Sequence, residues 1–217
     1  QWLRKTMRIS LAFVLALSAT VLSPRPLSAQ DLISVEPRVP TGFPARLRQK
    51  LARQSSERLA ATGVPVRSGA DIAVANLECA ISDRGEPAPK GFTFRAPPSA
   101  ADALVAAGID VVSLANNHIL DYGPDALSDT IAALDSRSIA HAGAGGNAAQ
   151  ARAPAIVTRG ALRIAFLSYI DVPLEWRGFD TRQWEAAEAT PGVAWLNVEQ
   201  VQADIAAARR VADLVVV

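Results

Sequence analysis

The sequence contains very few residues of the kinds that form disulfides or thiolate metal sites. Its 217 residues include one cysteine, Cys79, and two histidines. A single cysteine cannot form an internal disulfide, and two histidines with one cysteine cannot build a Cys/His-rich metal site. Any metal centre must therefore rely mainly on oxygen ligands. Cys79 is expected to pack as a small buried apolar group.

The sequence also lacks a strong excess of charge of one sign. Residues 1–29 hold four of the 22 basic residues and none of the acidic ones, which leaves 18 basic against 21 acidic residues in the rest of the chain. Proteins that bind nucleic acids concentrate positive charge on one surface. No nucleic-acid partner is therefore expected.

Residues 1–29 have the layout of a secretory signal peptide. Arg4, Lys5 and Arg8 precede the apolar run Ile9–Leu22, and small residues follow it. A membrane-spanning helix needs roughly 20 apolar residues, more than this run supplies. We expect an exported protein, periplasmic or extracellular. An uncleaved leader that anchors the protein in the membrane is the alternative.

The rest of the chain predicts an α/β protein. Residues 30–68 indicate a linker and a helical segment. Strands are expected at 71–77, 111–115, 139–142, 162–169 and 211–217, and helices at 99–107, 124–134 and 198–210. Strands that alternate with helices are typical of a largely parallel sheet. Residues 171–192 form a polar and aromatic segment with no assigned backbone.

Polar side chains follow two of these strands at the point where each ends. Asn76 and Glu78 follow the first strand, and Asn116, Asn117 and His118 follow the second. The carboxyl ends of parallel strands meet at one edge of a sheet, where binding sites usually lie. The sequence therefore predicts that these residues share one rim.

Asn76, Glu78 and Asn117 are the candidate metal ligands. Asn76 and Glu78 share one face of an extended segment, and their oxygens suit a hard or borderline divalent cation. The alternative is that Asn76 caps a turn and Glu78 is a solvated loop residue. In the next loop, one asparagine can hold the turn while the other faces the ion.

His118 and Asp121 are the candidate catalytic residues. His118 could protonate a leaving group or stabilise a transferring oxyanion, with Asp121 fixing its tautomer. The alternative is a structural histidine. Lys90, Arg95 and Asn116 are the candidate substrate-binding residues, since the guanidinium of Arg95 can grip an anion. A loop-stabilising arginine and a solvated lysine are the alternatives.

Several motifs in order resemble the bacterial CapA family of capsule and poly-γ-glutamate synthesis proteins. They are Ala75-Asn76-Leu77-Glu78, Phe92-Thr93-Phe94-Arg95-Ala96-Pro97-Pro98, Leu114-Ala115-Asn116-Asn117-His118 with Asp121-Tyr122-Gly123, and Gly143-Ala144-Gly145. The resemblance covers residues 69–217 as the N-terminal part of a CapA-type domain.

This family is similar to the calcineurin-like metallophosphoesterases, so the resemblance implies a layered sandwich of sheets and helices with two divalent ions at strand ends. It places Glu78 with Asn76 in the second metal motif, Asn117 as the asparagine of the Asn-His motif and His118 as the catalytic imidazole. Mn, Mg, Zn or Fe would be the metal.

The sequence departs from the family pattern in two places. Family members begin with a strand that ends in Gly-Asp, and residues 31–70 contain no such dipeptide. Members also continue into a His-Trp-Gly motif and a later His-rich motif, and this sequence stops at Val217, before them. A metal shell with fewer protein ligands holds an ion more weakly.

The resemblance implies an exported protein that makes, anchors or trims poly-γ-glutamate or another anionic polymer. Its site would be a metal-dependent hydrolase centre for a phosphoester or an amide bond. Its partners would be the polymer and a membrane-bound capsule synthesis complex. The alternative is a non-catalytic accessory or polymer-binding subunit of that complex.

Overall fold

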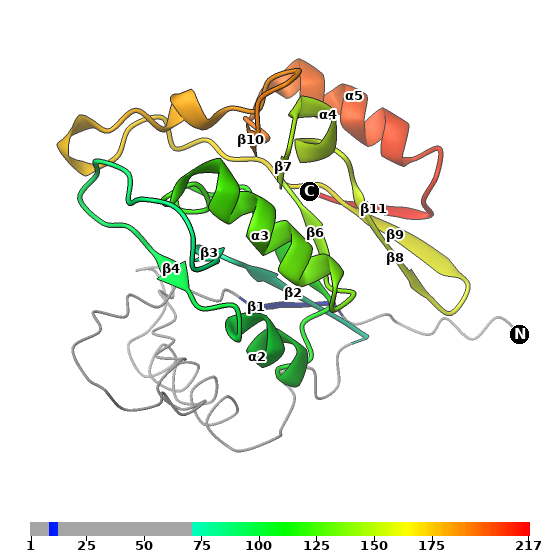
Figure 1. Cartoon of the computed structure of the whole chain (residues 1–217). Coiled ribbons are helices and arrows are strands. Elements are labelled where there is room, and N and C mark those ends of the chain that lie inside the picture. Colours follow the sequence, from blue (N-terminus) through cyan, green and yellow to red (C-terminus); the bar gives the residue numbers. More distant parts are fainter. Residues whose placement is uncertain (1–8, 13–70) are drawn as a thin grey trace, which may run out of the picture.

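A computed structural model describes residues 9–12 and 71–217 as a mixed α/β protein (Figure 1). The predicted linker and helical segment at 30–68 and most of the predicted signal peptide lie outside the described residues. Among the described helices, none is both long and apolar enough to cross a bilayer.

The first sheet has four parallel strands in the order β1-β2-β5-β6. These are β1 (Ile9–Ala12), β2 (Ile72–Asn76), β5 (Val111–Ser113) and β6 (Ala140–Ala142). The register places Asn76 beside Ser113 and Ser113 beside Ala142, so β2, β5 and β6 end at one rim. Strand β1 belongs to the segment with signal-peptide layout, and that assignment stays a prediction.

The second sheet has three strands in the order β11-β9-β8. Strand β9 (Leu162–Phe166) pairs in parallel with β11 (Leu214–Val216) and antiparallel with β8 (Ala155–Arg159). The sequence analysis did not predict β8. A signal was present in the sequence, because Ile156, Val157 and Thr158 are β-branched residues typical of strands. Gly160, at φ +59°, then makes the tight turn into β9.

Successive residues of the central strands point into different cores. In β2, Ile72 packs between the two sheets while Ala73 packs against the helices. In β9, Ile164 packs between the sheets while Ala165 packs toward the last helix. Side chains of a strand alternate between its faces, so a strand covered on both sides is apolar throughout. This explains the continuous apolar runs in the sequence.

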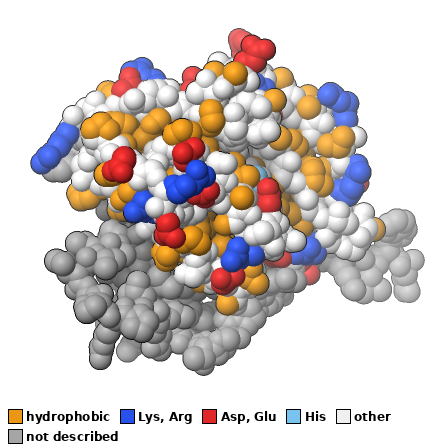
Figure 2. Space-filling view, viewed as in Figure 1, with side chains coloured by type: hydrophobic (Ala, Val, Ile, Leu, Met, Phe, Trp, Pro, Cys, Tyr) orange, Lys and Arg blue, Asp and Glu red, His pale blue; other side chains and the backbone are white. Residues whose placement is uncertain are grey.

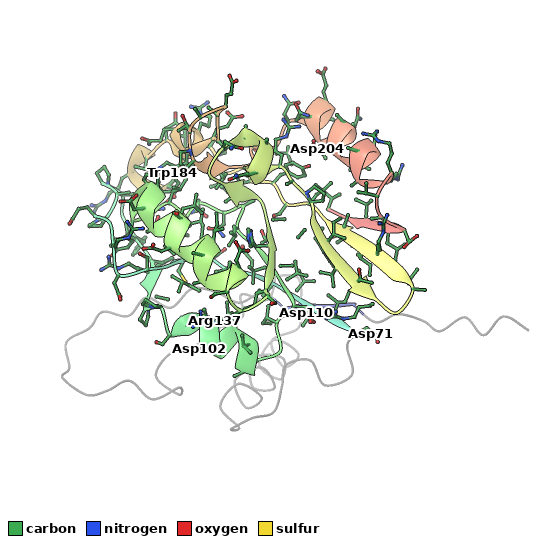
Figure 3. The ribbon with its side chains drawn as sticks, turned by 45° about the vertical axis from the view of Figure 1, so that its right-hand side comes forward. Asp71, Asp102, Asp110, Arg137, Trp184 and Asp204 are labelled. Carbon is green, nitrogen blue, oxygen red and sulfur yellow. The ribbon has the colours of Figure 1, made fainter. Side chains whose placement is uncertain are left out.

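The helices complete four layers, in the order helix, sheet, sheet, helix. Helices α2 (Ala100–Ala106) and α3 (Gly123–Asp135) cover the first sheet, and α5 (Val198–Ala208) covers the second (Figure 1). An ion pair of 2.7 Å between Arg137 Nε and Asp102 Oδ1 ties the end of α3 to α2 (Figure 3). All three predicted helices are present.

Shorter elements connect the layers. They are β3 (Ala80–Ile81) paired with β4 (Arg95–Ala96), β7 (Ala144–Gly145) paired with β10 (Gly192–Val193), α4 (Ala148–Ala151), and the 3₁₀ turns η1 (Trp176–Gly178) and η2 (Thr181–Trp184). The two 3₁₀ turns lie in the aromatic segment 171–192. On the face drawn in Figure 2, basic and acidic side chains are interspersed.

Candidate functional site

The predicted rim lies at the carboxyl ends of β2 and β5. The opposite ends of these strands are marked by Asp71, just before β2, and Asp110, just before β5. These two residues lie near each other at one end of the molecule, and Trp184 lies toward the other end (Figure 3). The loop 114–122 follows β5 at the rim. There the hydroxyls of Ser113 and Ser168 lie 2.6 Å apart and join the first sheet to the segment after β9. The rim is therefore held by both sheets.

Asn116 shapes the loop after β5. Its Oδ1 accepts hydrogen bonds from the backbone N–H groups of His118 and Ile119, both at 3.0 Å. Its Nδ2 donates to Asn76 Oδ1 at 3.1 Å and to the carbonyl of Leu77 at 2.8 Å. Asn116 is 5% exposed. It is therefore the asparagine that holds the turn, and its predicted contact with substrate would compete with these four bonds.

Asn76 connects this loop to Glu78. Asn76 Nδ2 donates to Glu78 Oε1 at 2.9 Å, which confirms that the two side chains share one face. Together with the bond from Asn116, this forms a continuous path from Glu78 to the backbone of His118. The structure thus brings the two predicted metal motifs together.

Asn117 differs from its neighbour. Its side-chain amide makes no hydrogen bond to any residue that the structure describes, and the residue is half-buried. Only its backbone carbonyl is engaged, by Lys90 Nζ. An amide oxygen without an internal partner, on a rigid loop beside His118, remains available to a ligand or an ion.

His118 is held by a carboxylate and an aromatic ring. Its Nδ1 lies 2.8 Å from Asp121 Oδ2, as the sequence predicted, and its ring centroid is 4.1 Å from that of Phe94. The His118 side chain is 11% exposed. Its Nε2 forms no hydrogen bond with another described residue. The geometry therefore leaves Nε2 as the atom that could meet a substrate.

Lys90 and Glu175 extend this pair into a buried cluster. Lys90 Nζ lies 2.6 Å from Asp121 Oδ1 and 2.6 Å from Glu175 Oε1. The Lys90 and Asp121 side chains are fully buried, and that of Glu175 is 11% exposed. Lys90 as a direct substrate ligand stays a prediction; here its cation faces two carboxylates. Sequence reasoning missed Glu175, since nothing near it in the chain signals a site.

Arg95 lies apart from this cluster. Its guanidinium stacks on the ring of Tyr122 at 4.2 Å and donates to the carbonyls of Arg84 and Gly85. These contacts fit the loop-stabilising alternative, and its role in gripping an anion stays a prediction.

Cys79 is buried close to the site but is not reactive. Desolvation, with smaller contributions from the charges of Asp121 and Glu78, raises the pKa of the thiol to about 12. The thiolate is the nucleophilic form of cysteine. Cys79 therefore serves packing, as the sequence analysis predicted.

The rim offers oxygen atoms of the kind that bind a divalent cation, but it offers too few of them for a complete coordination shell. Over residues 71–217 and 9–12, no group of three or more His, Cys, Asp or Glu side chains is arranged to hold a metal. The rim offers one carboxylate, Glu78, and the amide oxygens of Asn117 and Asn76. Hard cations take six or more oxygen ligands, so these residues can supply only part of a shell.

The layers and the rim define a class of protein: a mixed α/β protein with amide, imidazole and carboxylate groups gathered at the ends of parallel strands. Within that class, the family model of the bacterial capsule synthesis protein PGA_cap matches residues 42–217. The chain belongs to this family.

Named relatives agree with this assignment. A "probable polyglutamine synthesis accessory protein" of Mycobacterium tuberculosis, known from strains CDC 1551 and H37Rv, is 38% identical over 147 residues, which cover 67% of this chain and 38% of the relative. An uncharacterized protein of Sinorhizobium fredii is 33% identical over 145 residues, 63% of this chain and 31% of the relative. The chain thus spans less than two fifths of these relatives.

Proposed function

We propose that the complete protein is an exported member of its family that makes, anchors or trims poly-γ-glutamate or another anionic capsule polymer. Family membership and the relatives named for polyglutamine synthesis support the role. The partners would be the polymer itself and a membrane-bound synthesis complex. N-terminal sequencing of the protein recovered outside the cytoplasm tests whether residues 1–29 are removed.

We further propose that the rim is a metallophosphoesterase-like hydrolase site. The observation that carries this proposal is the Asn117 amide, which has no partner among the described residues, beside the His118–Asp121 pair, with Glu78 joined to them through Asn76 and Asn116. When bound, Mn, Mg, Zn or Fe ions would supply a Lewis acid and a metal-activated water.

The protein's own residues have separate tasks in this proposal. Glu78 and Asn117, with Asn76, would hold one side of the metal site, and further ligands must come from residues beyond those described. As the imidazolium, His118 would deliver the proton on Nε2 to the leaving group and become the neutral imidazole with its proton on Nδ1, while Asp121 orients the ring. The four-layer sandwich would hold these groups at fixed positions.

Metal binding tests the site directly. The complete protein is titrated with Mn²⁺ and followed by electron paramagnetic resonance. Asn117→Ala should weaken binding at least about tenfold, because loss even of an outer-shell partner has effects of that size. The control is Asn147→Ala, which removes the cap of α4, where Asn147 Oδ1 accepts from Gln150 N at 2.9 Å. Equal Mn²⁺ affinity in both variants would contradict the site.

Hydrolysis tests the role of His118. Phosphoesters and poly-γ-glutamate are offered to the metal-loaded protein, and His118→Asn should lower the rate of hydrolysis about 10²–10⁴-fold with Mn²⁺ affinity unchanged.

An accessory, polymer-binding subunit is the second candidate function, favoured by the small number of metal ligands at the rim. It predicts capsule polymer production that survives His118→Asn but not deletion of the protein.

A further inference from the structure

We propose that Lys90 is a positioning residue: it fixes the carboxylate of Asp121 and, through it, the orientation of the His118 ring. The inference rests on the proposed function of His118 in proton transfer. It assigns a task to a lysine that never has to touch the substrate.

The two oxygens of Asp121 have divided roles. Oδ2 accepts the backbone N–H of Phe94 at 2.6 Å and lies 2.8 Å from His118 Nδ1. Oδ1 faces Lys90 Nζ at 2.6 Å. Lys90 Nζ attracts Oδ1 as an ion pair without the geometry of a hydrogen bond, and this attraction opposes a rotation that would withdraw Oδ2 from the imidazole. The contact with Lys90 at Oδ1 and the N–H of Phe94 at Oδ2 therefore fix the His118–Asp121 geometry together.

Lys90 is itself fixed from several sides. Glu175 Oε1 and the carbonyl of Asn117 accept from its ammonium, and the rings of Trp184 and Phe179 lie 4.9 and 5.7 Å from Nζ. A buried ammonium requires compensation by paired charges and hydrogen bonds. Each of these partners is present, so the side chain has one favourable position.

This arrangement also selects the nitrogen that His118 presents. Lys90 Nζ is 3.5 Å from His118 Nδ1, and an ammonium donates hydrogen bonds but cannot accept one. The carboxylate oxygen Asp121 Oδ2, 2.8 Å from Nδ1, can only accept, so the proton on Nδ1 points to Oδ2 and not to the ammonium. In the neutral imidazole, Nε2 is then left without a proton and faces away from the cluster.

Nitrogen NMR of the complete protein labelled with ¹⁵N-histidine tests the proposal at one fixed pH at which His118 is neutral. The present sequence has two histidines, and His118→Gln and His141→Gln assign them. In the wild type, His118 should show a protonated Nδ1 and an unprotonated Nε2, with well-separated nitrogen shifts. A protonated Nε2 would overturn the proposal without any variant of Lys90.

Lys90→Met should remove the separation between the two nitrogen shifts of His118. Without the ammonium, the Asp121 carboxylate can move, and the ring can exchange between its two tautomers. Glu175→Gln is the matched variant: it removes a charge from the same buried cluster, but the amide oxygen still accepts from Lys90, so the His118 shifts should keep their separation. Equal loss in both variants, or no loss in Lys90→Met, would overturn the proposal.

His141 reports whether the fold survives. It pairs with Asp135 at 3.0 Å, at the last residue of α3, whereas the loop that carries Lys90 contacts α3 nearer its start, at Asp125, so the His141 signals should not change in either variant. The metal titration remains a separate test. If Mn²⁺ does not bind while the wild-type His118 is locked as described, the proposed hydrolase site fails and the role of Lys90 stands.

Discussion

Two cations on the loop between β3 and β4 make ion pairs of opposite character. Lys90 is fully buried and pairs with Asp121 and Glu175. Arg84 is 55% exposed and pairs with Asp129 at 2.6 Å and Asp125 at 3.5 Å on α3. Both residues attach the same loop to the rest of the protein, but of the two only the Lys90 side chain is shielded from water.

The difference in burial determines how much each ion pair contributes to the stability of the fold. Water screens the exposed pair, and such pairs contribute little to stability. The buried pair cannot be screened, so removing one partner leaves a charge in the interior. Arg84 therefore holds the loop loosely against α3, while Lys90 sets the geometry at His118.

The largest effect on stability is expected for Lys90→Met. It leaves Asp121 and Glu175 buried without their cation, so the free energy of unfolding in urea should fall by about 3–5 kcal/mol. Glu175→Gln should lower it less, because Glu175 keeps some exposure and glutamine still accepts a bond. A Lys90→Met variant as stable as wild type would show that water enters the cluster.

Asn116→Ala should have the next largest effect. It removes the acceptor for two backbone N–H groups and the donor to Leu77, and the free energy of unfolding should fall by about 2–3 kcal/mol, because only some of these groups are fully buried. Asn117→Ala is the matched control and should change the free energy of unfolding by less than about 0.5 kcal/mol. Similar losses in the two variants would contradict the separate tasks of these asparagines.

Arg84→Met should have the smallest effect, and it should depend on pH. Hydrogen bonds from Arg84 and then Ser82 lower the pKa of Asp129 to about 2. A lowered pKa stabilises the fold above the unfolded-state value near 4, and this contribution is lost as the pH falls through 2. Urea midpoints of wild type and variant should differ slightly at pH 6 and converge near pH 2.

Sequence reasoning identified most of the residues that the structure gathers at the rim because these residues follow strands. The run into Asn76 and the run into Asn116 are each apolar and short, and both lie in the sheet as expected. The spacing of His118 and Asp121 within one turn also allowed their pairing to be predicted. Local sequence carries this information because neighbouring residues in a loop must lie close in space.

The contributions of Lys90 and Glu175 could not be predicted in the same way. Glu175 lies 85 residues beyond Lys90, in a segment whose backbone follows no periodic pattern. Strand β8 was missed for a related reason: it is recognised through its pairing with β9, and its own alternation is short.

By itself, the sequence determined the central strands, the longer helices and the polar residues at the rim, because hydrophobic periodicity and loop chemistry act over a few residues. Only the tertiary structure decided that Lys90 turns inward to two carboxylates, that Asn116 holds the loop and that the side chain of Asn117 bonds to none of the described residues. Those outcomes depend on which groups lose water when distant segments pack together, and burial is a property of the whole fold.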